Sequence, residues 1–316
     1  MRVLVTGGAG FLGMHLCRAL RARGDEVTVY EHLPTALPWG LERLAGVGEV
    51  VDGDILDGAL LEKVLGERRI QKIIHCAAIV GVAQSVGIEH KVAAVNILGA
   101  LNVFEAVRKS PAIETCVNIS SEEVYGEFTA DPIPEESPCA PVSPYGISKY
   151  TAERYGDYYR RKFGCGIVSL RTSWVYGPGL PRNRVPRDFI LSILKEGRIS
   201  EPQGGEQKLD FTYIDDFVQG VLLACERSPR FGVYNIASGT GHTLAELAGM
   251  LQALCPGTRV DLGAGLMPFD AERRVTLPQK GALDISRAAQ DLGYAPRFPA
   301  AKGVAAYLDY LRDNEY

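Results

Sequence analysis

The chain has 316 residues, of which 46% are hydrophobic and 23% charged, and its formal net charge is −4. This length and composition are ordinary for a globular protein with a sizeable core, in one large domain or two lobes. There is no basic run or acidic tail, and no apolar stretch approaches the ~18 residues of a membrane span, so neither nucleic acid nor a membrane is an expected partner.

The cysteines and histidines show no metal-binding pattern. Seven cysteines are present without a C-x-x-C pair, and several lie within apolar strand or helix patterns. Reduced thiols are therefore expected, which favours a cytoplasmic location. The histidines are scattered without zinc-ligand spacing, so no metal site is expected. A strand is predicted to begin at residue 2, so we expect no signal peptide before the fold.

Glycines follow the first predicted strand at once. Residues 2–6 form a short apolar strand, and an amphipathic helix is predicted at 11–23. Gly7 and Gly10 lie between the strand and the helix, and Gly13 lies in the first turn of the helix. Glycines at such a turn let the backbone approach a pyrophosphate, whose charge the amides at the helix start can bind. The order of strand, tight turn and helix therefore predicts a dinucleotide-binding unit.

The second predicted strand, at 26–30, is followed by Glu31. A carboxylate at this point can accept hydrogen bonds from both ribose hydroxyls of an adenosine, and it would repel a 2′-phosphate. The sequence therefore favours NAD over NADP. A protonated His32 would pair with a phosphate and weaken this preference, although an exposed loop histidine is the simpler interpretation.

Strands and helices alternate through the first half of the chain. Further strands are predicted at 72–77, 114–119 and 166–171, and helices at 57–66, 89–109 and 144–163. Breaker-rich segments lie at 31–40, 129–144 and 176–186. The alternation predicts an α/β fold of the Rossmann type, a doubly wound parallel sheet with helices on both faces.

Beyond residue 176 the pattern is less regular. Helices are predicted at 185–196, 215–227, 242–254 and 299–313. We expect an NAD-binding domain of residues 1–176 plus 214–240. Residues 177–213 plus 241–316 are expected to form a smaller C-terminal α/β substrate lobe.

Two segments carry candidate catalytic residues. Tyr145 and Lys149 are four residues apart on a predicted helix and share one face. A nearby ammonium and an oxidised nicotinamide both favour a phenolate, which makes Tyr145 a candidate general acid/base for an alcohol proton. Ser121 follows a predicted strand, at the edge where sites of open α/β sheets lie, and is placed to bond the same oxygen. A helix-surface pair and a serine-rich turn are the alternative interpretations.

In this order and spacing the motifs resemble the extended short-chain dehydrogenase/reductases, specifically the NAD-dependent nucleotide-sugar epimerase/dehydratase group. The resemblance spans the chain. It rests on segments 6–13, 53–55, 75–78, 120–126, 143–149, 175–178 and 210–216, and on Asn96 within Val-Asn-Ile-Leu-Gly.

The resemblance implies a role for each matching position. The expected cofactor-binding residues are Gly7, Gly10, Phe11, Leu12 and Gly13 at the pyrophosphate, Glu31 at the adenosine ribose, Asp54 and Ile55 at adenine, Ala77, Ala78 and Asn96 along the cleft, and Tyr145 and Lys149 at the nicotinamide ribose. Ser121 and Tyr145 would act on a sugar C4 hydroxyl. Oxidation gives a 4-keto intermediate, and its reduction on the other face makes the enzyme an epimerase. A homodimer through helices 89–109 and 144–163 is also implied.

Glu122 and Glu123 leave other outcomes open. Sugar 4,6-dehydratases of this group usually carry an acidic pair after the Ser/Thr, and uronate decarboxylases carry a lone Glu before Val-Tyr-Gly. Epimerases often have small or neutral residues there. Glu123 is a candidate to remove the C5 proton, and Glu122 to protonate a departing C6 hydroxyl. Alternatively, one or both side chains point to solvent, since adjacent strand-end residues usually point opposite ways.

The expected grip on the substrate diphosphate is altered. Trp174 stands where many members have Asn, and Leu209 stands where many have an Arg whose bidentate contact Leu cannot replace. Arg274 matches a second phosphate-side arginine, and a solvated surface arginine is its alternative interpretation. Candidates to compensate are Lys208, Arg182 and Arg184.

A nucleotide-sugar epimerase is therefore the main expectation, with a dehydratase or decarboxylase that uses Glu123 as the alternative. Trp174 and Leu209 favour a third possibility, a simple NAD-dependent sugar dehydrogenase. A non-catalytic NAD-binding protein is the fourth, against which the intact set of Ser121, Tyr145 and Lys149 stands.

Overall fold

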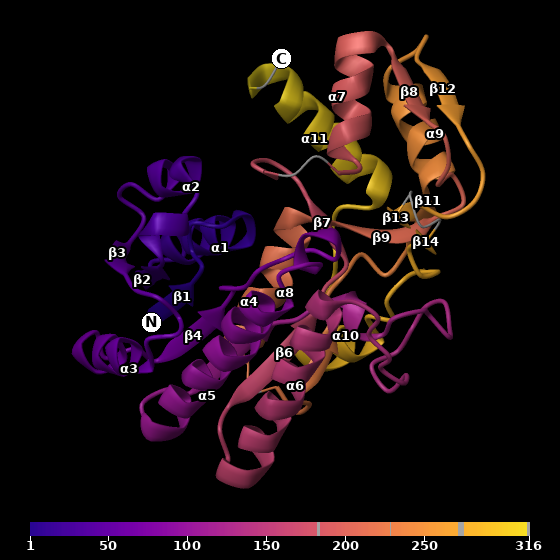
Figure 1. Ribbon diagram of the computed structural model, residues 1–316. Coiled ribbons are helices and arrows are strands. Elements are labelled where there is room, and N and C mark those ends of the chain that lie inside the picture. Colours follow the sequence, from indigo (N-terminus) through magenta and orange to yellow (C-terminus); the bar gives the residue numbers. More distant parts are fainter. Residues whose placement is uncertain (182–183, 228, 271–274, 315–316) are drawn as a thin grey trace.

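A seven-stranded parallel sheet forms the centre of the computed structural model, which describes residues 1–181, 184–227, 229–270 and 275–314 (Figure 1). Its strand order is β10-β6-β5-β4-β1-β2-β3. The strands are β1 (Arg2–Thr6), β2 (Glu26–Glu31), β3 (Glu49–Asp52), β4 (Lys72–His75), β5 (Thr115–Ile119), β6 (Ile167–Arg171) and β10 (Val233–Asn235). The predicted Rossmann-type, doubly wound sheet is confirmed.

Helices cover both faces of this sheet. They include α1 (Phe11–Ala22), α3 (Gly58–Glu67), α5 (Gly99–Lys109), α6 (Pro144–Phe163) and α8 (Ile214–Glu226). Helix α5 packs between α3 and α6, whereas α1 packs against α8. Along β1 the side chains alternate between two cores, with Val3 and Val5 on the α1 side and Leu4 on the α5 side. Strands buried on both faces read as continuous apolar runs, which is why the sequence reveals β1, β4, β5 and β6.

The helix predicted at 89–109 is interrupted. It consists of α4 (Glu89–Ala93), a π-helical turn η3 (Ala94–Leu98) and α5. Asn96 lies in this wider turn and is buried. Its side chain accepts a hydrogen bond from the Ile79 amide at 2.7 Å and donates one to the Ile79 carbonyl at 2.9 Å. The turn thereby ties the helix to the loop that follows β4.

The remaining strands form smaller sheets. Strand β7 (Trp174–Tyr176) pairs in parallel with β9 (Lys208–Tyr213), which pairs antiparallel with β11 (Gly241–Thr243). Strand β8 (Arg198–Glu201) pairs with β12 (Arg259–Leu262), and β13 (Pro268–Asp270) with β14 (Val275–Thr276). Strand β7 thus pairs outside the central sheet.

Figure 1 shows α7 (Arg187–Glu196), α9 (Leu244–Leu254) and α11 (Ala300–Asn314) grouped with β8 and β12 at one end of the molecule. The helix predicted from residue 242 begins at Leu244, because Thr243 and Glu246 form a capping box at its start. Two short helices were not predicted, α2 (Pro38–Arg43) and α10 (Ser286–Leu292). Among the helices of the described ranges, none has the length and hydropathy that crossing a bilayer requires.

Candidate active site

A cavity of about 810 Å³ opens where the central strands end. Its walls come from the segments that follow β1, β2, β4, β5 and β6, together with the start of α1 and of α6. Open α/β sheets place their ligands at this carboxyl edge of the strands. The cavity is large enough for an extended ligand that reaches from the α1 turn to the residues after β5 and β6.

The α1 turn is shaped for close approach of an anion. Gly10 precedes α1 without a side-chain cap, and no acidic residue lies in the first turn of the helix. The first amides of α1 are therefore left for a ligand, at the positive end of the helix dipole. Gly13 packs against the turn itself, since a Cβ there would lie 2.3 Å from the Gly7 carbonyl oxygen. The observed geometry fits a pyrophosphate.

The cavity brings together nearly all of the predicted cofactor-binding residues. Its lining includes Gly7, Gly10, Phe11, Leu12, Gly13, Glu31, Asp54, Ile55, Ala77, Ala78, Tyr145 and Lys149. Asn96 does not line it. The side chain of Asn96 bonds Ile79 and also donates to Ser148 Oγ at 2.9 Å, so it positions the loop and helix behind the wall.

Glu31 is held in place by the backbone of the glycine turn. Its carboxylate accepts hydrogen bonds from the amides of Ala9, at 2.9 Å, and His32, at 3.2 Å. Burial raises the pKa of Glu31, although both amides oppose the shift. The carboxylate therefore faces the cavity at a fixed point one strand away from the α1 turn.

Tyr145 and Lys149 face the cavity from the first two turns of α6. The ammonium of Lys149 lies 5.9 Å from the centre of the Tyr145 ring and donates to the Ile119 carbonyl oxygen at 2.8 Å. Burial lowers the pKa of Lys149 to about 8, while Cys76 and Glu153 act to raise it. Ser121, which follows β5, lines the same cavity and accepts a hydrogen bond from the Glu123 amide.

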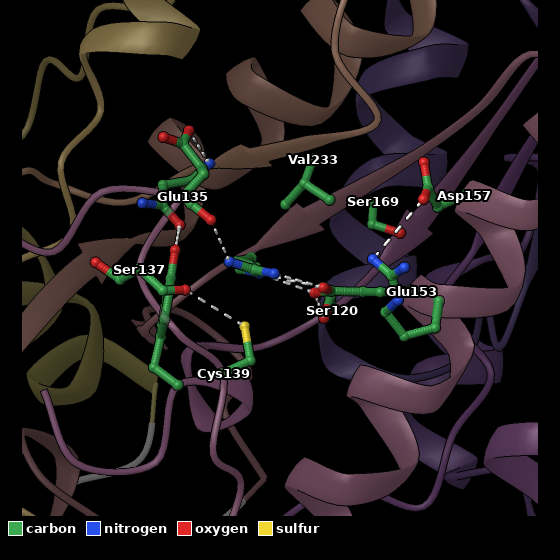
Figure 2. A network of polar contacts seen from close by, with 12 residues as sticks. Ser120, Glu135, Ser137, Cys139, Glu153, Asp157, Ser169 and Val233 are labelled. Atoms are coloured by element: carbon green, nitrogen blue, oxygen red, sulfur yellow. Dashed lines mark hydrogen bonds and ion pairs between the residues drawn. The ribbon is translucent and has the colours of Figure 1, made fainter. Parts of the chain in front are cut away.

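A buried ion pair fixes α6 to the sheet edge (Figure 2). Arg171, at the end of β6, donates from Nη2 to Glu153 at 2.7 Å, and both side chains are at most 5% exposed. Ser120 donates to the same carboxylate at 2.5 Å. Arg171 also donates to the Glu135 carbonyl oxygen. The network thus joins the helix that carries Tyr145 to the residue beside Ser121. Neither Arg171 nor Glu153 was singled out from the sequence.

Both glutamates after Ser121 belong to the lining of the cavity, and the Glu122 and Glu123 side chains are largely buried. The expectation that strand alternation would separate them does not apply, because Glu122–Val124 is a 3₁₀ turn, η4, and not part of β5. Glu122 is 2% exposed and accepts a hydrogen bond from Ser173 Oγ at 2.6 Å. Burial raises the pKa of Glu122, and the Glu123 carboxylate acts in the same direction.

Lys280 supports the acid pair from the C-terminal part of the chain. Its Nζ lies 3.4 Å from Glu123 Oε2 and donates to the Gly126 carbonyl oxygen at 2.9 Å. Its side chain is 3% exposed. Neither Lys280 nor Ser173 was singled out from the sequence. Ser173 follows a predicted strand, which was a usable signal, whereas Lys280 is 157 positions from Glu123 and gave none.

Arg184, one of the candidates to bind the substrate diphosphate, lies in the wall of the cavity. Its guanidinium lies 5.0 Å from the centre of the Trp174 ring and donates to the Val175 carbonyl oxygen at 2.7 Å, and Trp174 and Arg184 both line the cavity. Lys208 is instead paired with Asp131. Leu209 is 1% exposed and belongs to the core. Arg182 and Arg274 lie outside the described residues.

This arrangement defines a class of enzyme. A glycine turn for a pyrophosphate and a Ser-Tyr-Lys set share one cavity at the edge of a Rossmann-type sheet. Dinucleotide-dependent oxidation and reduction of an alcohol is the chemistry that these groups provide together.

The chain belongs to the NAD dependent epimerase/dehydratase family, which matches residues 3–237. It is 31% identical to a dTDP-glucose 4,6-dehydratase of Streptomyces antibioticus, over 99% of this chain and 93% of the relative. It is 30% identical to a putative UDP-glucose 4-epimerase of Methanocaldococcus jannaschii, over 99% of each chain. These findings confirm the resemblance stated from the motifs.

Solved structures give the same result. A UDP-glucose 4-epimerase of Thermotoga maritima with UDP-glucose superimposes with a TM-score of 0.87 at 30% identity, over 100% of both chains. A UDP-glucuronic acid 4-epimerase of Bacillus cereus, in complex with UDP-glucuronic acid and NAD, gives a TM-score of 0.85 at 28% identity, over 99% of both chains.

Proposed function

We propose that this protein is an NAD-dependent nucleotide-sugar 4-epimerase. The observation that carries the proposal is the shared cavity, where Ser121, Tyr145 and Lys149 face the same space as the α1 turn and Glu31. Similarity over the whole length to UDP-glucose and UDP-glucuronate 4-epimerases supports it. Glu31 supports NAD as the cofactor, since its carboxylate would meet a 2′-phosphate with like charge.

The residues divide the work of the reaction. Ser121 and Tyr145 hold the sugar C4 hydroxyl, and Tyr145 removes its proton as the carbon is oxidised. The Lys149 ammonium stabilises the phenolate and binds the nicotinamide ribose. The bound cofactor supplies the hydride acceptor and donor. After the 4-keto sugar has turned, C4 is reduced on its opposite face and Tyr145 returns the proton to the C4 oxygen.

The remaining parts of the site bind the ends of the ligands. The α1 turn, Asp54, Ile55, Ala77 and Ala78 hold the cofactor. Arg184, set against Trp174, is the cation proposed for the substrate diphosphate. The lobes that we propose are the predicted ones, residues 1–176 plus 214–240 for the cofactor and 177–213 plus 241–316 for the substrate. The return of the chain to the central sheet at β10 supports this division.

A 4,6-dehydratase is the second candidate, and a specific observation favours it. Glu122 and Glu123 both line the cavity beside Ser121. The raised pKa of Glu122 suits an acid, and Glu123, paired with Lys280, suits a base. A 4-keto group acidifies the C5 proton, so the same oxidised sugar would lose water if the two carboxyls act on C5 and C6.

Product analysis decides between these candidates. The purified protein is incubated with UDP- and dTDP-hexoses and with UDP-uronates, and the products are followed by NMR and by absorbance of NADH. We expect interconversion of C4 epimers without net NADH. A 4-keto-6-deoxy sugar would establish the dehydratase, and accumulation of NADH would establish a dehydrogenase. Binding of NAD without turnover of any sugar would contradict an enzymatic role.

We also propose that the protein is a homodimer through α6 and the adjoining helix of 89–109. The side chains Ile147, Tyr155 and Tyr158 on α6 are 40–51% exposed and follow a helical spacing of one face. Leu98, at the join of η3 and α5, is 55% exposed. Figure 1 shows α5 and α6 side by side, so a second copy would complete a four-helix contact.

Replacement of Tyr155 by Glu is expected to convert the dimer to a monomer, because it places a charge in the apolar face. Light scattering measures the mass. The control is Val260→Glu, which adds the same charge at an exposed residue of β12 and leaves the dimer intact. A Tyr155→Glu protein that stays dimeric would place the contact elsewhere.

A cytoplasmic location remains part of the proposal, supported by seven free cysteines, all within the described residues.

A further inference from the structure

The acid pair lies directly beside the reacting group. Gly146, next to Tyr145, packs so closely on η4 that a Cβ there would lie 2.7 Å from the Glu123 carbonyl oxygen. The first turn of α6 therefore rests on the segment that carries Ser121, Glu122 and Glu123. In a hexose, C4 is bonded to C5, and C5 carries the C6 group. If the C4 oxygen lies between Ser121 and Tyr145, the C6 group is therefore close to these carboxyls.

The two carboxyls of the pair share one nearby ammonium. Two carboxyls line the cavity, and Lys280 forms an ion pair with Glu123 from behind the wall. Its ammonium is engaged by the Gly126 carbonyl and lies 5.2 Å from the centre of the Phe128 ring. Lys280 is not part of the lining, and its charge acts on both carboxyls from behind the wall.

The other basic residues of the lining belong to segments other than the one that carries the acid pair. In the described part of the chain they are His32, Lys91, Lys149 and Arg184. The Lys149 ammonium bonds the end of β5, and Arg184 lies over Trp174. Lys91 is exposed on α4, where water screens its charge, and His32 follows Glu31 at the opposite end of the cavity. Beside Glu122 and Glu123 the lining therefore offers acceptors for hydroxyl groups, and a carboxylate placed there would meet like charge.

We propose that Glu122 and Glu123 select nucleotide sugars with a neutral hydroxymethyl group at C6 and reject uronates, whose C6 is a carboxylate. This inference rests on the proposed function and names its substrate class. A hexose hydroxyl donates a hydrogen bond to either carboxyl, whereas the carboxylate of a uronate meets the Glu123 carboxylate as a like charge in a partly buried space. The same selection disfavours a uronate decarboxylase and is compatible with both the epimerase and the 4,6-dehydratase.

The test compares binding of UDP-glucose and UDP-glucuronate to the NAD-loaded protein by calorimetry, so that it does not depend on turnover. We expect the wild type to bind UDP-glucose at least about 10²-fold more tightly, a separation of the size that like charges produce in a partly desolvated site. Equal or tighter binding of UDP-glucuronate overturns the inference and leaves the proposed function standing. Binding of neither overturns both.

Two variants are expected to move this ratio in opposite directions. Glu123→Gln removes a carboxylate and leaves Lys280 without its partner, so the affinity for UDP-glucuronate relative to UDP-glucose should rise at least about tenfold. Lys280→Met leaves Glu123 without its cation, so the ratio should fall. The matched control is Glu127→Gln, which changes the same charge at an exposed residue of the same loop. If Glu123→Gln changes the relative affinity for UDP-glucuronate and UDP-glucose no more than Glu127→Gln does, the inference is wrong.

Discussion

Replacement of Tyr145 by Phe is expected to lower kcat about 10²–10⁴-fold, the usual contribution of a positioned general acid/base. The ring is 7% exposed and lines the cavity, so Phe keeps its packing and loses only the hydroxyl. The substitution leaves the α1 turn and Glu31 in place, so bound NAD should be retained. The measurements are the rate of epimer formation, the NAD content after gel filtration and the melting temperature.

Lys149→Met is the matched variant for this prediction. The ammonium lies 5.9 Å from the centre of the Tyr145 ring, and Tyr145 keeps its hydroxyl, so the loss of Lys149 should change the pH dependence of the reaction without removing the base. Without that cation the phenolate is less stable, and the limb of the kcat/KM profile that reports deprotonation should move to higher pH. If Tyr145→Phe retains activity within tenfold of the wild type, Tyr145 is not the base and the proposed mechanism is wrong.

The parts of the fold that the sequence predicts are those with a strong local pattern. The β1–α1 unit has an apolar run, a glycine turn and an amphipathic helix in direct succession, and each is where it was expected. Strand β3 was missed because Glu49–Asp52 lies at the sheet edge, largely exposed, and has little apolar signal. Strand β7 follows β6 after two residues, and nothing in its three residues shows that they pair with β9.

The site residues that the sequence predicts are likewise those that belong to a local motif. Residues that belong to a local motif, such as Tyr145 with Lys149, were predicted and share the cavity. Lys280 and the Arg171–Glu153 pair depend on contacts between distant segments, for which a single sequence gives no periodicity. The alternative that Glu122 and Glu123 point opposite ways assumed strand geometry, whereas the chain leaves β5 and tightens into η4, where alternation by two no longer holds.

Loss of the Arg171 side chain is expected to lower the free energy of unfolding by about 3–5 kcal/mol, the usual cost of leaving a buried charge without its partner. In Arg171→Met, Glu153 loses its ion pair and keeps the hydrogen bond from Ser120, although its side chain is only 2% exposed. Arg171 also lies 4.6 Å from the centre of the Tyr125 ring, so packing is lost along with charge. Urea denaturation followed by circular dichroism gives the change.

The double variant Arg171→Met with Glu153→Met separates the charge effect from general disruption of the core. Two apolar side chains of similar size leave no buried charge, so the double variant should be more stable than Arg171→Met alone. Arg161→Met is the surface control on α6, where the pair with Asp157 is exposed and contributes little. A stability for Arg171→Met equal to that of Arg161→Met would show that the buried pair is dispensable, and α6 would then be held on the sheet by its apolar contacts alone.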